Sequence, residues 1–211
     1  MHIRKKYLAM PTKLILASSS PRRAELLRDA GIAFDVRAAQ IDEARHPNEI
    51  AAKMVARLAE AKARAAAETA GEQNPAIIIG ADTAVELDGE IFGKPRDAAD
   101  AREMLSYLSG RTHYVLTGIY VLRLPDGAAR SAVETTAVTF SQLDQKEIDA
   151  YVRSGEPLDK AGGYAIQGLA GRYIPRVEGC YFNVVGLPLA RLYVLLGELD
   201  WREDGLAARE K

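Results

Sequence analysis

An aspartate and a lysine that lie near each other in the chain are the first candidates for chemistry. Asp82 follows a run of isoleucines through Gly80 and Ala81, and Lys94 lies in the GKP triplet at 93–95. The Asp-Gly dipeptide at 88–89 suits a type I′ hairpin turn, which would return Lys94 toward Asp82. This pairing indicates a site for a phosphorylated substrate with a divalent metal. The alternative is an N-capping aspartate and a solvated lysine.

A second cluster combines three hydroxyls with two arginines in the sequence SSSPRR at 18–23. Ser20 suits a helix N-cap and Pro21 the first helical position. Free N–H groups at a helix start, together with hydroxyls and arginines, predict an anion site. Because neighbouring residues point about 100° apart on a helix, Arg22 and Arg23 are expected to have different partners. Ordinary solvated arginines are the alternative.

Two further polar residues interrupt otherwise unremarkable segments. Lys62 falls on the apolar stripe of a helix that the pattern predicts from Pro47 to about Thr69. An inward lysine needs an anionic partner, unless its amine reaches past the stripe to solvent. Gln167 lies in a glycine-rich segment, and its amide could both donate to and accept from a base edge. A plain loop glutamine is the alternative.

The elements that must position these residues alternate between strands and helices, which predicts an α/β fold. The isoleucine run at 77–79, bounded by Pro75 and Gly80, indicates a core strand that ends just before Asp82. The carboxyl ends of such strands are where open α/β sheets bind ligands. Further strands are predicted at 14–17, 34–38, 84–87, 90–92, 113–124, 128–140 and 181–185, and further helices from Pro21, at 98–108, from Asp144 and at 189–199.

Composition narrows the class of protein. The 211 residues suffice for one large domain or two lobes that share a core, and we assign residues 13–200 to a single domain between tails at 1–12 and 201–211. Met10 is an alternative start. A net charge of −1 favours neither nucleic acid nor membrane as a partner. Cys180 is the only cysteine, and three histidines are too few and scattered for a zinc site. No secretion signal is evident, so we expect a cytoplasmic protein.

With these segments placed, the chain resembles the Maf family of nucleoside triphosphate pyrophosphatases over residues 14–199. The resemblance rests on motifs in one order: ASSSPRR at 17–23, IDE at 41–43, AKA at 61–63, GADT at 80–83, GKP at 93–95, LSG at 108–110, TG at 117–118, DKAGGYAIQG at 159–168 and VGLP at 185–188. It implies a mixed sheet flanked by helices, related to inosine triphosphatases, with a cleft between two lobes. It also implies a Mg²⁺ or Mn²⁺ cofactor and homodimers.

The resemblance also implies roles for individual residues. Asp82 would be the proton acceptor and, with Glu43, would hold the metal. The substrate-specificity positions would be Arg22, Thr83 and Gln167, and the phosphate-binding residues would be Ser18, Arg23, Lys62 and Lys94.

The expected activity is hydrolysis of a pyrimidine nucleoside triphosphate between its α and β phosphates. The stretch at 159–168 resembles the branch that acts on dTTP and UTP, with modified pyrimidine nucleotides as further substrates. The alternatives are the 7-methyl-GTP branch and a nucleotide-binding regulator of septum formation with little turnover.

Overall fold

The computed structural model describes residues 12–70 and 75–202. The predicted tail at 1–11, with the alternative start at Met10, and residues 203–211 of the other tail lie outside the described residues. Trp201, which we assigned to the C-terminal tail, instead packs against the core, with its ring at an edge to Tyr193.

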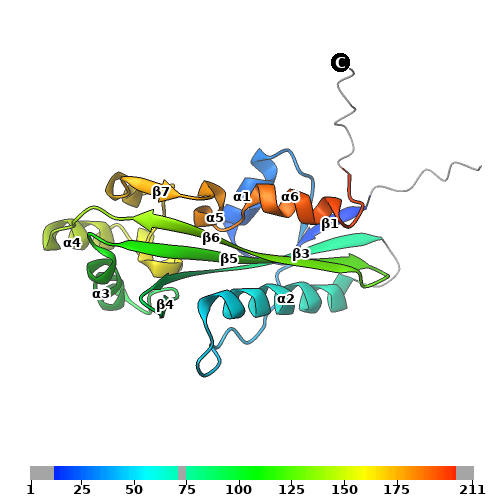
Figure 1. Ribbon diagram of the computed structural model, residues 1–211, viewed down its shortest axis with the longest axis horizontal. Coiled ribbons are helices and arrows are strands. Elements are labelled where there is room, and N and C mark those ends of the chain that lie inside the picture. The colour runs from blue at the N-terminus through cyan, green and yellow to red at the C-terminus, as the bar shows by residue number, and fades with distance from the viewer. Residues whose placement is uncertain (1–11, 71–74, 203–211) are drawn as a thin grey trace, which may run out of the picture.

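The centre of the described structure is one seven-stranded mixed sheet, which confirms the predicted α/β class (Figure 1). Its order is β2-β1-β3-β5-β6-β7, and β4 also pairs with β3. The first three strands in that order are mutually parallel, whereas all other pairs are antiparallel. The strands are β1 (Lys13–Leu16), β2 (Asp35–Val36), β3 (Ala76–Leu87), β4 (Glu90–Phe92), β5 (Thr112–Leu124), β6 (Ala129–Thr139) and β7 (Arg176–Glu178).

Strand β3 is longer than predicted, and Asp82 lies in its middle rather than after its end. On one side β5 pairs with β3 from Ala76 to Glu86. On the other side β1 pairs only as far as Ile79, and β4 begins to pair at Val85. The edge of β3 at residues 80–84 therefore has no neighbouring strand within the described chain. Asp82 lies on this open edge, just beyond the carboxyl end of β1.

The strand was predicted to end too early because Gly80 does not end β3. Gly80 instead makes room for a helix. A Cβ on Gly80 would lie 2.0 Å from the carbonyl oxygen of Ala59 in helix α2 (Ala51–Ala70). A Cβ on Gly118 of β5, which pairs with Asp82, would lie 2.3 Å from the carbonyl oxygen of Val55. Both glycines let α2 lie directly on the sheet, because no side chain separates the two backbones.

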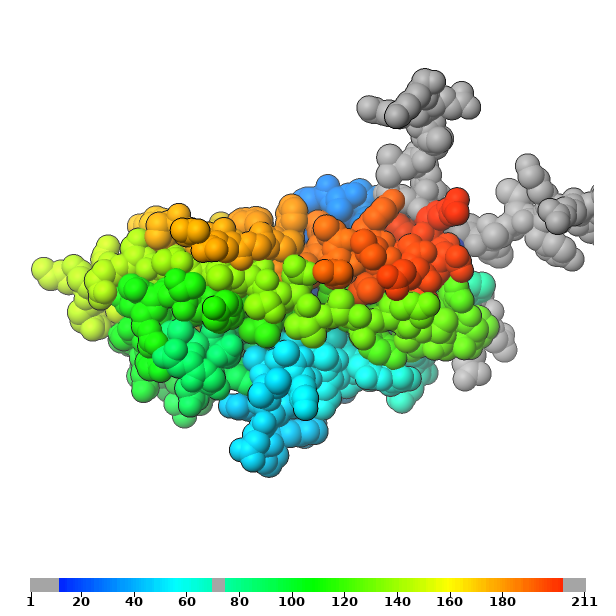
Figure 2. All heavy atoms as spheres, in the orientation of Figure 1, coloured from blue at the N-terminus to red at the C-terminus, as the bar shows by residue number. Residues whose placement is uncertain are grey.

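The helices cover both faces of the sheet (Figure 1). Helices α1 (Pro21–Asp29), α5 (Tyr181–Val185) and α6 (Leu189–Gly197) lie on one face and α2 on the other. Helices α3 (Ala98–Leu108) and α4 (Gln145–Arg153) lie at the end of the sheet near β4 and β7, where their apolar residues form part of a separate core cluster. Figure 2 shows the segment before α2 projecting from the lower face. Among the described residues, no helix combines the length and apolar character needed to cross a membrane.

Most predicted helix and turn signals are confirmed. Asp97 caps α3 and Asp144 caps α4 through their side chains. Gly31, at a φ of 76°, follows the end of α1 as a C-terminal cap. Asp88 and Gly89 have φ values of 54° and 83°, as the type I′ turn between β3 and β4 requires.

Three local predictions differ from the structure. Residues Tyr181–Val185 form α5 rather than a strand, because Gly186 at a φ of 122° caps a short helix and the Asn183 side chain bonds the carbonyl oxygen of Val115. Helix α2 begins at Ala51 rather than Pro47, because Asn48 has a φ of 57°, which no right-handed helix contains. The predicted strand at 34–38 shortens to the two residues of β2.

Candidate active site

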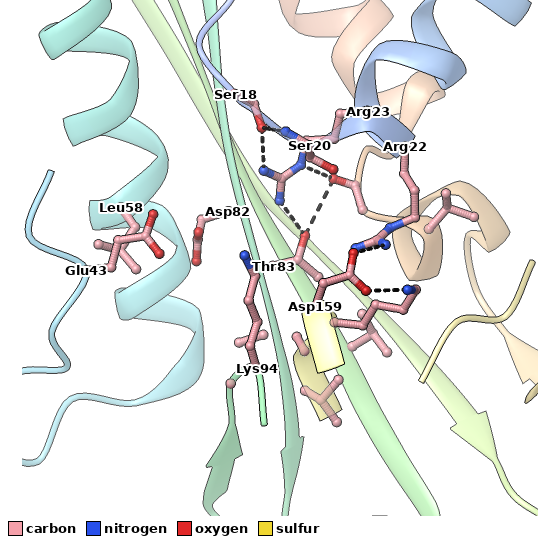
Figure 3. A pocket seen from close by; sticks show the side chains of 18 of the residues that line it. Ser18, Ser20, Arg22, Arg23, Glu43, Leu58, Asp82, Thr83, Lys94 and Asp159 are labelled. Carbon is pink, nitrogen blue, oxygen red and sulfur yellow. Dashed lines mark hydrogen bonds and ion pairs between the residues drawn. The ribbon is translucent and has the colours of Figure 1, made fainter. Parts of the chain in front are cut away.

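All of the candidate residues line one pocket of about 540 Å³, a size typical of small-molecule sites. The pocket lies around the open edge of β3. Because successive side chains of a strand point to opposite faces, this edge presents two kinds of chemistry. Asp82 faces α2, whereas Thr83 faces α1 and α5. Figure 3 shows the two halves facing a common space, with Lys94 reaching in from below.

The half that faces α2 is a buried acid–lysine cluster. The Nζ of Lys62 lies 2.6 Å from Oδ1 of Asp82 and 2.8 Å from Oε1 of Glu43. Lys62 and Asp82 are only 9% and 8% exposed, so the inward lysine has anionic partners and does not reach past the apolar stripe to solvent. Glu43 comes from the segment before α2 and is exposed.

Burial makes the Asp82 carboxyl more basic than a solvated one. Desolvation raises the pKa of Asp82, and the charges of Lys62 and Arg23 only partly oppose this rise. A carboxylate with a raised pKa is a stronger proton acceptor near neutral pH. The cluster could therefore bind a water molecule and accept its proton.

The other half is organised by Arg23, which is 8% exposed. Its guanidinium makes four hydrogen bonds: Nε donates to the carbonyl oxygen of Gly186 at 2.8 Å, and the Nη atoms donate to Ser18, Ala81 and Thr83 at 2.9–3.0 Å. Since arginine carries five N–H donors, one of them has no partner among the described residues and is available to a ligand. The same burial lowers the pKa of Arg23 from its usual value.

Arg22 points elsewhere, as expected for the neighbour of Arg23. Its guanidinium lies 3.6 Å from Oδ2 of Asp159, a residue that also pairs with Lys160. Lys94 and Gln167 line the same pocket, and within the described chain neither side chain has a hydrogen-bond or ion-pair partner. Their polar groups are thus available to a ligand.

The acids fit a divalent cation only in company with a substrate. Glu43 and Asp82 converge on Lys62, and within the described residues no group of three histidine, cysteine or acidic side chains could hold a metal. Mg²⁺ is commonly bound by one or two carboxylates plus the oxygens of substrate phosphates. The pair therefore fits a cation that arrives with a phosphorylated ligand.

Several residues near this site were not identified from the sequence. Arg57 forms two hydrogen bonds with the Glu49 carboxylate, both at 2.7 Å, and a third with the carbonyl oxygen of Ala44. These three bonds fasten the segment that carries Glu43 to α2. The hydrogen bonds from Arg57 to the Glu49 carboxylate lower the pKa of Glu49 to about 2. Asp159 and Lys160 lie within a motif that we had noted, but the pairing of Glu49 with Arg57 leaves no local signal in the sequence.

Comparison with known proteins relates the chain to one family. The family model described as "Maf-like protein" matches residues 13–199. A protein of Anaeromyxobacter sp. (strain Fw109-5) named dTTP/UTP pyrophosphatase is 53% identical over 203 residues, covering 93% of this chain and 96% of its own. One of Hahella chejuensis with the same name is 48% identical over 88% of this chain and 92% of its own.

A solved structure agrees at the level of the fold. The Ham1 protein of Staphylococcus aureus superposes with a TM-score of 0.50 at 14% identity, covering 89% of this chain and all of that one. Identity this low supports the shared architecture alone.

Proposed function

The chain belongs to the Maf family, and from that premise we propose that it hydrolyses dTTP and UTP to the nucleoside monophosphate and pyrophosphate. The observation that carries this proposal is the buried pairing of Asp82 with Lys62 on the open edge of β3, in the pocket that also holds Lys94, whose amine has no partner among the described residues. A basic carboxylate between two lysines suits attack by water on a polyphosphate. The names of the relatives support the substrate class.

In this mechanism Asp82 orients a water molecule and accepts its proton as the oxygen attacks the α-phosphorus in line. Lys62 and Lys94 neutralise the charge that develops on the leaving pyrophosphate. Glu43 and Asp82 would hold Mg²⁺ or Mn²⁺, and the ion would supply positive charge that stabilises the phosphates during hydrolysis. Ser18 and the one spare N–H of Arg23 complete the phosphate contacts.

The residues that select the base lie on the side of the pocket opposite the acid–lysine cluster. The amide of Gln167 can donate to a carbonyl and accept from the N3–H of uracil or thymine at once. Arg22 supplies a donor to the second carbonyl. The Thr83 hydroxyl is already bonded to Arg23 and to Thr117 at 2.9 Å, so its contribution is to hold Arg23 in place.

The test is pyrophosphate release from dTTP, UTP, CTP, GTP and 7-methyl-GTP, with and without Mg²⁺ or Mn²⁺. We expect metal-dependent release that is fastest with dTTP and UTP. Gln167→Glu should erode this preference, because an ionised carboxylate cannot donate to a carbonyl. Faster release from 7-methyl-GTP would overturn the base assignment, and nucleotide binding without turnover would favour a regulatory role. The homodimer stays a prediction, which sedimentation analysis can check.

A further inference from the structure

The segment at 165–169, which carries Gln167 into the pocket, is held at both ends from outside the pocket. The hydroxyl of Tyr151 in α4 accepts a hydrogen bond from the backbone N–H of Ala165 at 3.2 Å. The same hydroxyl donates to Oε1 of Glu156 at 2.8 Å. Oε2 of Glu156 accepts from the backbone N–H of Leu169 at 3.0 Å. One tyrosine–glutamate pair thus bonds the backbone two residues before Gln167 and two residues after it.

The fit between Glu156 and the segment is close. A Cβ on Gly168 would lie 2.4 Å from both carboxylate oxygens of Glu156, although the φ of −107° would suit any residue. Gly168 therefore leaves the space that the carboxylate occupies, and the φ value alone does not call for glycine there. Tyr151 is 1% exposed, and burial raises the pKa of its hydroxyl, so the donor to Glu156 stays protonated at any pH at which the protein works.

We propose that Tyr151 and Glu156 are positioning residues for base selection, which act by fixing the backbone on either side of Gln167. This inference rests on the proposed function. An amide selects uracil or thymine over cytosine only if its oxygen and nitrogen face the base edge in one orientation, so a mobile segment would lose the selection. The residues assigned to the phosphates and the metal take no part in these bonds. Loosening the segment should therefore reduce the preference for uracil and thymine over cytosine, and it should leave the rate of the hydrolytic step unchanged.

Tyr151→Phe tests this, because it keeps the buried ring and removes only the hydroxyl. We expect the ratio of kcat/KM for dTTP over CTP to fall about tenfold, roughly the effect of one hydrogen bond. The change should lie in the KM for dTTP and UTP, with kcat within about twofold of the wild-type value. Glu156→Ala should act in the same direction. The double variant should be no worse than the worse single one, because both residues act through the same bonds.

Tyr120→Phe is the matched control. It removes a hydroxyl that bonds Nη2 of Arg64 at 2.9 Å, away from the pocket, and should leave the ratio unchanged. If Tyr151→Phe and Glu156→Ala lower the melting temperature and kcat for all nucleotides but keep the wild-type ratio, the residues only stabilise the fold and the inference is wrong. A wild-type protein that does not discriminate between pyrimidine bases would overturn this inference together with the proposed base preference.

Discussion

Replacing Lys62 by methionine would remove one partner of a buried ion pair while filling most of its space. Asp82, which is 8% exposed in the wild type, would keep the favourable charge of Arg23 and the unfavourable like charge of Glu43. A buried carboxylate in this position must either stay ionised at a cost or take up a proton. The free energy of unfolding should therefore fall, and the loss should depend on pH.

The size of the loss follows from the geometry. The Nζ–Oδ1 distance of 2.6 Å places the two charges roughly 3 Å apart, which corresponds to about 5 kcal/mol at an effective dielectric constant near 20. Removing one partner of a buried pair costs about 3–5 kcal/mol. Because the pocket lets water reach Asp82 in the variant, we expect a loss of about 3 kcal/mol at pH 8.

The pH dependence has a definite sign. The pKa of Asp82 in the folded protein is raised, so its contribution to stability is full below the unfolded pKa of about 4 and is lost as the pH rises through the folded value. Without Lys62 the folded pKa rises further. The variant should thus be nearly as stable as wild type at pH 4.5, and the difference should grow toward pH 8.

Urea unfolding of both proteins at pH 4.5 and pH 8 measures this difference. Lys53→Met, at an exposed position on the same helix, is the control and should have little effect at either pH. Adding Asp82→Asn to Lys62→Met should recover much of the loss at pH 8, because position 82 then carries no charge. An equal loss at both pH values would show that methionine packs poorly and that the charge on Asp82 is not the cause.

Three other substitutions test the site and its support. Asp82→Asn should lower hydrolysis about 10²-fold or more in steady-state assays while nucleotide binding survives; near wild-type turnover would remove Asp82 as the base. Lys94→Met should weaken triphosphate binding more than monophosphate binding in calorimetric titrations, and equal losses would place the amine away from the pyrophosphate. Gly80→Ala should lower the free energy of unfolding by about 2–3 kcal/mol through its clash with α2, whereas Gly197→Ala, with open space around it, should not.

The sequence predicted individual side chains better than it predicted their partners. Helical periodicity depends only on local spacing, so it placed Lys62 on the inward face, but the acids that meet it come from β3 and from the segment before α2. The same limit applies to Tyr151. Its burial in α4 follows from the apolar stripe, whereas its bonds to Glu156 and Ala165 depend on how a later loop folds back.

Two of the wrong predictions have a similar cause, which is that local residue types do not show what packs against them in the fold. Gly80 was taken as the end of a strand but is a point of contact with α2. Residues 181–185 were predicted as a strand, yet the cap at Gly186 and the side-chain bonds of Asn183 stabilise a helix. The roles expected of the pocket residues came from the family resemblance. For Arg23 that role was phosphate binding, but protein groups already accept hydrogen bonds from four of its five N–H donors.

The continuity of β3 and β5 limits how the molecule can move. Each strand contributes to the core clusters at both ends of the sheet, so no flexible linker joins the two ends within the described chain (Figure 1). Rotation of one end against the other would bend a paired ladder, unlike the hinge closure of proteins whose domains meet at loops. Small-angle scattering should therefore give the same radius of gyration with and without nucleotide. A change in the radius of gyration on nucleotide binding would contradict this reasoning, because it would require a hinge within the paired strands.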